Sequence, residues 1–119
     1  MDAYINHPAA VAGKLAGESA VVVATAWLHD VLEDTKETPD TLRASGVPDS
    51  VIHAVEVLTK TEGVSYDEYL RGVRQNWIAR RVKIADMLHN LSDAPTDRQI
   101  IKYAKGLLFL LNMPGEPRP

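Results

Sequence analysis

The sequence predicts an all-α protein, a bundle of short to medium helices with no significant sheet. Apolar residues recur three and four positions apart in several segments, which is the spacing of one helix face. No segment shows the period-two alternation of a half-buried strand over more than a few residues. With 119 residues the chain is long enough to bury one core. We therefore expect a single domain over residues 1–113 and a disordered, proline-rich tail over residues 114–119.

The composition is that of an ordinary globular protein and narrows the possible ligands. Hydrophobic residues make up 45% of the chain, charged residues 24%, and the formal net charge is -3. Because the Lys and Arg residues are not gathered into one run, binding to DNA or to an anionic membrane is not favoured. Cysteine is absent, so a metal would need His and carboxylate ligands. The absence of a secretory signal and of a run of membrane-spanning length predicts a cytoplasmic location.

Two helices are expected in the first third of the chain. Proline is tolerated at the first position of a helix, so His7-Pro8 predicts a helix start with His7 at its entrance. This helix should stop near Gly17. The next one begins at residues 18–19, and its Ala- and Val-rich sequence continues to Glu33, where a polar segment ends it.

The later helices are delimited by capping residues, proline and glycine. Thr38 before a proline and Thr96 are predicted N-caps, and Ser65 begins the Ser-x-x-Glu pattern of a capping box. Trp27 and Trp77 are most simply core residues. We expect further helices over residues 39–44, 50–58, 66–75, 77–92 and 97–112.

A cluster of polar side chains follows the apolar sequence of the second helix. His29, Asp30, Glu33 and Asp34 stand within six residues and would share an arc of roughly 140° on a continuous helix. Acidic groups and a histidine at the end of a buried helix are costly unless a partner compensates them, and a bound cation is one such partner. The cluster therefore predicts a site.

A second cluster lies on the long helix predicted over residues 77–92. Lys83, Asp86 and Asn90 are three and four positions apart, so they share one face within an arc of about 60°. Asp86 can ligate a cation, Asn90 can donate and accept hydrogen bonds, and Lys83 can meet a phosphate as a point charge. This row suits an anion that is held beside a metal.

Three motifs together resemble a known family. Residues 4–8 (YINHP), 29–35 (HDVLEDT) and 83–90 (KIADMLHN) are similar, in content and in order, to motifs of the HD-domain hydrolases of the RelA/SpoT group, and in particular of the stand-alone small alarmone hydrolases. The resemblance covers nearly the whole chain. It implies an HD-type helical bundle that binds one divalent cation, usually manganese, through His7, His29, Asp30 and Asp86.

The resemblance also implies an activity and further site residues. The family's substrates are guanosine tetraphosphate and pentaphosphate, from which hydrolysis at the 3′ position releases pyrophosphate and GDP or GTP. Glu33 and Asp34 match the family's Glu-Asp pair, which would orient the attacking water and manage protons. The expected nucleotide contacts are Lys83 with the phosphates and Asn90 with the sugar or phosphate, with Lys60 and Tyr103 as further candidates.

One departure from the family keeps other functions open. Family members carry a helix and a base-packing arginine before the first motif, whereas six residues precede His7 here and none is basic. The missing helix would expose apolar surface and favour homo-oligomers. The alternatives are hydrolysis of another 2′- or 3′-phosphorylated nucleotide, or a non-catalytic nucleotide-binding or antitoxin-like module.

Each candidate residue also has a purely structural interpretation. His29 and Asp30 could form a hydrogen bond that closes a helix end, and Glu33 and Asp34 could be a solvated helix terminus, although carboxylates there oppose the helix dipole. Lys83 could simply solvate its helix together with its arginine neighbours. His53 and His89 show no partner pattern and are not candidates.

Overall fold

The computed structural model describes residues 3–113, and within this range the chain forms α helices and no strand. The predicted all-α fold is thus confirmed, while the predicted tail over residues 114–119 lies outside the described residues. The helices are α1 (Ala3–Lys14), α2 (Ala20–Leu28), α3 (Val31–Asp34), α4 (Pro39–Ala44), α5 (Asp49–Leu58), α6 (Tyr66–Gln75), α7 (Trp77–Leu91) and α8 (Asp97–Leu111).

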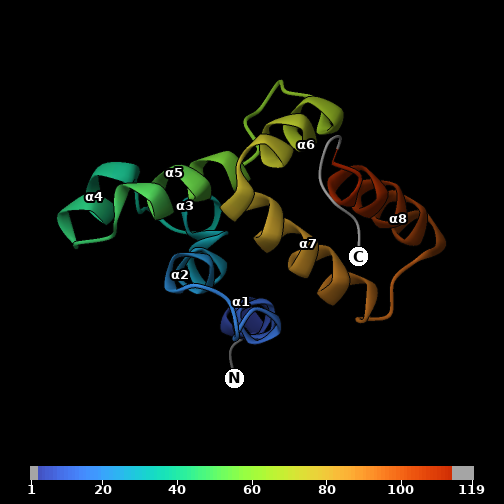
Figure 1. Cartoon of the computed structure of the whole chain (residues 1–119), viewed down its shortest axis with the longest axis horizontal. Helices are drawn as coiled ribbons and strands as arrows, with labels where there is room; N and C mark the ends of the chain where they lie inside the picture. The colour runs from blue at the N-terminus through green and yellow to red at the C-terminus, as the bar shows by residue number, and fades with distance from the viewer. Residues whose placement is uncertain (1–2, 114–119) are drawn as a thin grey trace.

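Helix α7 runs through the middle of the molecule and organises the core (Figure 1). It contacts α1, α2, α5, α6 and α8. Its inward face contributes apolar side chains that include Val82 and Met87, both fully buried. Val11 of α1, Val22 of α2 and Leu110 of α8 are buried in the same cluster. Since the helices on every side pack on α7, a polar residue on α7 can meet side chains from several helices.

Capping residues set four helix starts, at Thr38, Ser65 and Thr96 as the sequence predicts and at Asn76, which was not predicted. The side chains of Thr38, Ser65, Asn76 and Thr96 each accept a hydrogen bond from a backbone N–H three residues later. Such a bond satisfies one of the free donors at a helix N-terminus. The capping box predicted at Ser65 is altered. In a regular box the Glu68 carboxylate accepts from the Ser65 backbone N–H, whereas here it accepts from the Ser65 hydroxyl.

The expected start of the first helix is wrong. Helix α1 begins at Ala3 and carries Pro8 inside it, so His7 lies in the helix and not at its entrance. A proline within a helix loses one backbone hydrogen bond. Pro8 is buried and α1 packs against α2 and α7, so tertiary packing outweighs this local cost.

The expected continuous second helix is also wrong. Helix α2 ends at Leu28, and Asp30 takes φ -107° and ψ 5° before the short helix α3 begins. The His29 side chain donates from Nδ1 to the carbonyl of Ala26 (2.7 Å), which occupies an acceptor at the end of α2. The backbone N–H of Asp34 then bonds to the carbonyl of Asp30 (2.9 Å). The acidic residues Glu33 and Asp34 therefore lie on the separate helix α3 and do not continue α2.

Several large apolar side chains are exposed, and two of them contradict the core assignment. Trp27 is 51% and Trp77 60% exposed. On α8, Leu110 is buried whereas Leu108 is 70% exposed, so only one face of that helix packs on the bundle. The packed face comes close to α7 at Gly106, where a Cβ atom would lie 2.7 Å from Met87 Cε.

Within the described residues, none of the helices has the length and apolar character needed to cross a membrane.

Candidate metal centre and adjoining cleft

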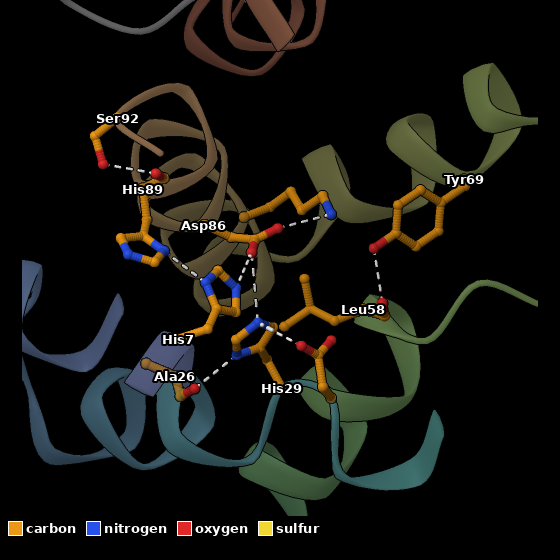
Figure 2. Close-up of polar contacts among 10 residues, drawn as sticks. His7, Ala26, His29, Leu58, Tyr69, Asp86, His89 and Ser92 are labelled. Carbon is orange, nitrogen blue, oxygen red and sulfur yellow. Dashed lines mark hydrogen bonds and ion pairs between the residues drawn. The ribbon is translucent and has the colours of Figure 1, made fainter. Parts of the chain in front are cut away.

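Three helices bring together a compact group of possible metal ligands. His7 comes from α1, His29 from the end of α2 and Asp86 from α7, and one ligand atom of each lies within 4.8 Å of the others. His7 Nε2 is 2.6 Å from Asp86 Oδ1, and His29 Nε2 is 3.5 Å from the same oxygen. Figure 2 shows both imidazole rings turned toward this carboxylate. One cation could touch all three residues.

The hydrogen bonding of His29 fits a metal ligand. Its Nδ1 donates to the Ala26 carbonyl, because a carbonyl can only accept. The other nitrogen, Nε2, is buried and has no hydrogen-bond partner of good geometry. A buried nitrogen that points at a carboxylate without a hydrogen bond is suited to bind a cation. Two imidazoles and a carboxylate are also the donor types that divalent transition metals take.

The electrostatics of the group favour a positive charge at its centre. Burial opposes ionisation of Asp86, but contacts from His29 and His7 hold the pKa of its carboxyl well below the usual range. Burial likewise works against protonation of His29, yet the carboxylates of Asp30 and Asp86 outweigh it and raise its pKa to about 10. Asp86 is thus a negative charge inside the group, and a cation bound between the three residues would be attracted to it.

Lys83 adjoins this group, and its side chain does not simply extend into solvent. Its Nζ lies 2.9 Å from Asp86 Oδ2, and its side chain is only 17% exposed. The ammonium also lies 5.4 Å from the centre of the Tyr69 ring. Burial lowers the pKa of Lys83, but the Asp86 charge dominates and raises it. The solvated-helix interpretation of Lys83 is thus wrong, and its charge stands beside the metal position.

Asp30, the fourth expected ligand, lies next to the three-residue group but outside it. Its Oδ2 is 3.2 Å from His29 Nε2, and about a third of its side chain is exposed. The hydrogen-bond interpretation for His29 and Asp30 would need Nε2 to donate, and Nε2 has no hydrogen-bond partner in the structure. Metal ligation by Asp30 stays a prediction.

A cleft of about 490 Å³ opens beside the metal group. Of the residues predicted from the sequence, it is lined by His29, Asp30, Glu33, Lys60 and Lys83. The other predicted site residues are not in its described lining: His7, Asp34, Asp86, Asn90 and Tyr103. Tyr103 is connected to the cleft indirectly, since its ring lies 5.5 Å from Nζ of Lys102, which does line the cleft.

Sequence reasoning missed four polar or aromatic residues of this region. Tyr66, Tyr69 and Lys102 line the cleft, and the Tyr69 hydroxyl donates to the carbonyl of Leu58 (2.7 Å). His89 contacts His7, with 2.6 Å between their Nδ1 atoms. The one available signal was the position of His89, three residues after Asp86 and so on the same face of α7.

The fold and the His-His-Asp group define an all-helical domain of the HD type with a candidate metal centre, and sequence comparisons agree with this class. No protein-family model matches the chain. The chain is 34% identical over 101 residues to a probable GTP pyrophosphokinase of Mycobacterium leprae (strain TN). It is 31% identical over 105 residues to the guanosine-3′,5′-bis(diphosphate) 3′-pyrophosphohydrolase MESH1 of Danio rerio. Each alignment covers 76% of this chain, but only 13% and 54% of the respective relative.

A solved structure shares the fold. It is that of a metazoan ortholog of SpoT, a protein that hydrolyses ppGpp and plays a role in starvation responses. The two structures superpose with a TM-score of 0.72 and 28% sequence identity, over 91% of this chain and 71% of the other. The expected resemblance to HD-type alarmone hydrolases of the RelA/SpoT group is therefore confirmed in sequence and in fold.

Proposed function

We propose that the protein is a metal-dependent phosphohydrolase that removes the 3′-pyrophosphate from guanosine tetraphosphate and pentaphosphate. The observation that carries the proposal is the group of His7, His29 and Asp86, of which the last two are buried, beside a cleft lined by lysines. The similarity to a 3′-pyrophosphohydrolase and to a ppGpp-hydrolysing structure supports the same chemistry. As part of the proposal, the protein acts in the cytoplasm as a single HD domain over residues 1–113.

The metal part of the proposal assigns four ligands. His7, His29 and Asp86 would hold the cation, and Asp30 would join them from the rim of the cleft. A divalent cation, in our proposal manganese, would supply a Lewis acid that polarises the phosphate and lowers the pKa of bound water. The two neutral imidazoles and two carboxylates offset its double charge.

The remaining roles fall to residues of the cleft. Glu33 is exposed and lines the cleft, so its carboxylate is free to accept a proton from the attacking water, and Asp34 follows it in the same turn. Lys83, held against Asp86, presents a fixed positive charge to the reacting phosphate. Lys60 also lines the cleft and would contact the departing pyrophosphate. Asn90 and Tyr103 remain proposed contacts to the nucleotide.

The positively charged lining of a second cleft favours a substrate with two anionic groups. It has a volume of about 400 Å³, lies between α6 and α8, and shares Tyr66 and Lys102 with the first cleft. Arg71 and Lys105 add two further positive charges to its lining, against one carboxylate from Asp67. A nucleotide whose 3′-diphosphate lies at the metal could place its 5′-diphosphate toward these cations.

The decisive experiment is an assay of the purified protein with guanosine tetraphosphate and added manganese, in which GDP and pyrophosphate are separated and quantified. We expect hydrolysis that is removed by chelation and restored by metal. Guanosine tetraphosphate that stays intact with metal bound would contradict the proposal.

One observation favours a second candidate substrate. The described lining of the first cleft includes no arginine, so the guanine-packing arginine that the family resemblance implies has no counterpart there. A different nucleotide with a 2′- or 3′-phosphate would then be the substrate. A panel of such nucleotides decides between the two, and binding of nucleotide without any hydrolysis would instead indicate the non-catalytic module.

A further inference from the structure

We propose that His89 is a positioning residue, which fixes the ring and the tautomer of His7 so that His7 Nε2 faces the metal. The inference rests on the proposed metal site and extends it by a residue that no motif argument assigned. It concerns the side of His7 that faces away from the cation.

The geometry places His7 between two side chains of α7. Its Nε2 lies 2.6 Å from Asp86 Oδ1, and its Nδ1 lies 2.6 Å from His89 Nδ1. The rings of His7 and His89 are 4.7 Å apart and tilted by 36°. Figure 2 shows the ring of His7 held from both ends. Asp86 and His89 are three residues apart, so a single helix face fixes both nitrogens of His7.

The position of the protons follows from this contact once a cation is bound at His7 Nε2. Two nitrogens at 2.6 Å form a hydrogen bond only when one carries a hydrogen and the other offers a lone pair. If His7 Nε2 gives its lone pair to a cation, the proton of His7 is on Nδ1. His89 Nδ1 is then the acceptor, and His89 carries its own proton on Nε2. Metal-binding histidines generally donate their second N–H in this way.

The other histidine of the site has the same arrangement with a different acceptor. His29 donates from Nδ1 to the Ala26 carbonyl, which leaves its Nε2 for the metal. The two rings therefore use Nδ1 as donor and Nε2 as ligand. The backbone that carries His89 is held in the last turn of α7, because the hydroxyl of Ser92 donates to the His89 carbonyl (2.7 Å).

The test measures metal binding directly and does not depend on turnover. Binding of Mn²⁺ is followed by electron paramagnetic resonance for the wild type, His89→Leu and His89→Asn. Leucine removes the acceptor, and we expect Mn²⁺ affinity to fall about 10- to 100-fold. Asparagine places Oδ1 where His89 Nδ1 stood, so most of the affinity should return. His53→Leu, a change at an exposed histidine of α5, is the matched control and should leave binding unchanged.

The outcomes separate this inference from the proposed function. Wild-type affinity in His89→Leu, or an equal loss in His89→Asn, would overturn the positioning role while hydrolysis by the wild type still supported the proposed function. A wild-type protein that binds no metal would overturn both. If His89→Leu does not fold, His89→Gln replaces it, because its amide lies one bond further out and does not reproduce Nδ1. Retained affinity in that variant would equally contradict the inference.

Discussion

The metal group and the cleft wall differ in how far the protein fixes them. His29 and Asp86 are 4% and 5% exposed, and the side chains of the metal group contact other side chains or backbone. Glu33 and Lys60, on the cleft wall, are exposed. The metal group is thus arranged before any ligand binds, whereas the wall residues keep their hydration until a substrate arrives. Changes in the metal group should therefore remove function, and changes on the wall should reduce it by degrees.

The largest effect is expected for Asp86→Ala. The change removes the carboxylate that His7, His29 and Lys83 share, and it leaves the Lys83 ammonium without its counterion. We expect Mn²⁺ binding to be lost and hydrolysis to fall by about 10³-fold or more. Circular dichroism would verify that the variant folds, and Asp40→Ala, at an exposed carboxylate of α4, is the control. Turnover that survives in folded Asp86→Ala would remove the basis of the mechanism.

A smaller loss with a different signature is expected for Glu33→Gln. The amide keeps the shape of the side chain but cannot accept a proton, so kcat should fall by about 10²- to 10⁴-fold. Because Glu33 is outside the metal group, Mn²⁺ affinity should stay close to that of the wild type. Steady-state kinetics together with a metal titration separate the two effects, with Glu56→Gln on α5 as the control. Weakened Mn²⁺ binding in Glu33→Gln would contradict the separation of the cleft wall from the metal group.

Metal removal should lower stability, because the cation would link α1, α2 and α7. At a Mn²⁺ concentration of 100 times Kd, we expect about 2.7 kcal/mol of added stability, measured as a shift in thermal or denaturant unfolding. The Asp86→Ala variant should show no such shift, whereas Glu33→Gln should show all of it. An equal shift in all three proteins would mean that the ion binds somewhere else.

The smallest effect is expected on the cleft wall, for Lys60→Gln. An exposed charge that meets one substrate phosphate contributes about 1 kcal/mol, so KM should rise about fivefold with kcat nearly unchanged. Lys36→Gln, an exposed lysine that does not line the cleft, should have no effect. A loss in kcat instead of KM would show that Lys60 acts on the transition state, and the wall would then resemble the metal group.

Local signals were sufficient for most helices of the fold. Thr38, Ser65 and Thr96 marked helix starts correctly, because a cap depends on residues only three positions away. Pro8 was misleading, because its local cost is overridden by packing that sequence periodicity does not contain. The end of α2 was missed for a similar reason, since a side-chain bond from His29 closes that helix.

Residues of the candidate site could be named from the sequence where they form a motif, but not where they meet only through the fold. His7, His29 and Asp86 were all named in advance, and the structure brings them together. His89 was set aside because its partner, His7, is 82 residues away and nothing adjacent marks the pair. Lys102 was not predicted for the same reason, because it lines the cleft from a helix that carries no motif.

Because Lys83, Asp86 and His89 lie on one helix, the site is sensitive to insertions and deletions within α7 as well as to substitutions. The three residues keep a common face only while the spacing between them is preserved. A deletion of one residue between Val82 and Asp86 would rotate the following residues by about 100° around the axis of α7. Asp86 and His89 would then turn away from His7 together, even though α7 stayed helical. Evolutionary change in this segment is therefore expected to proceed by substitution, with insertions and deletions confined to the loops that flank α7.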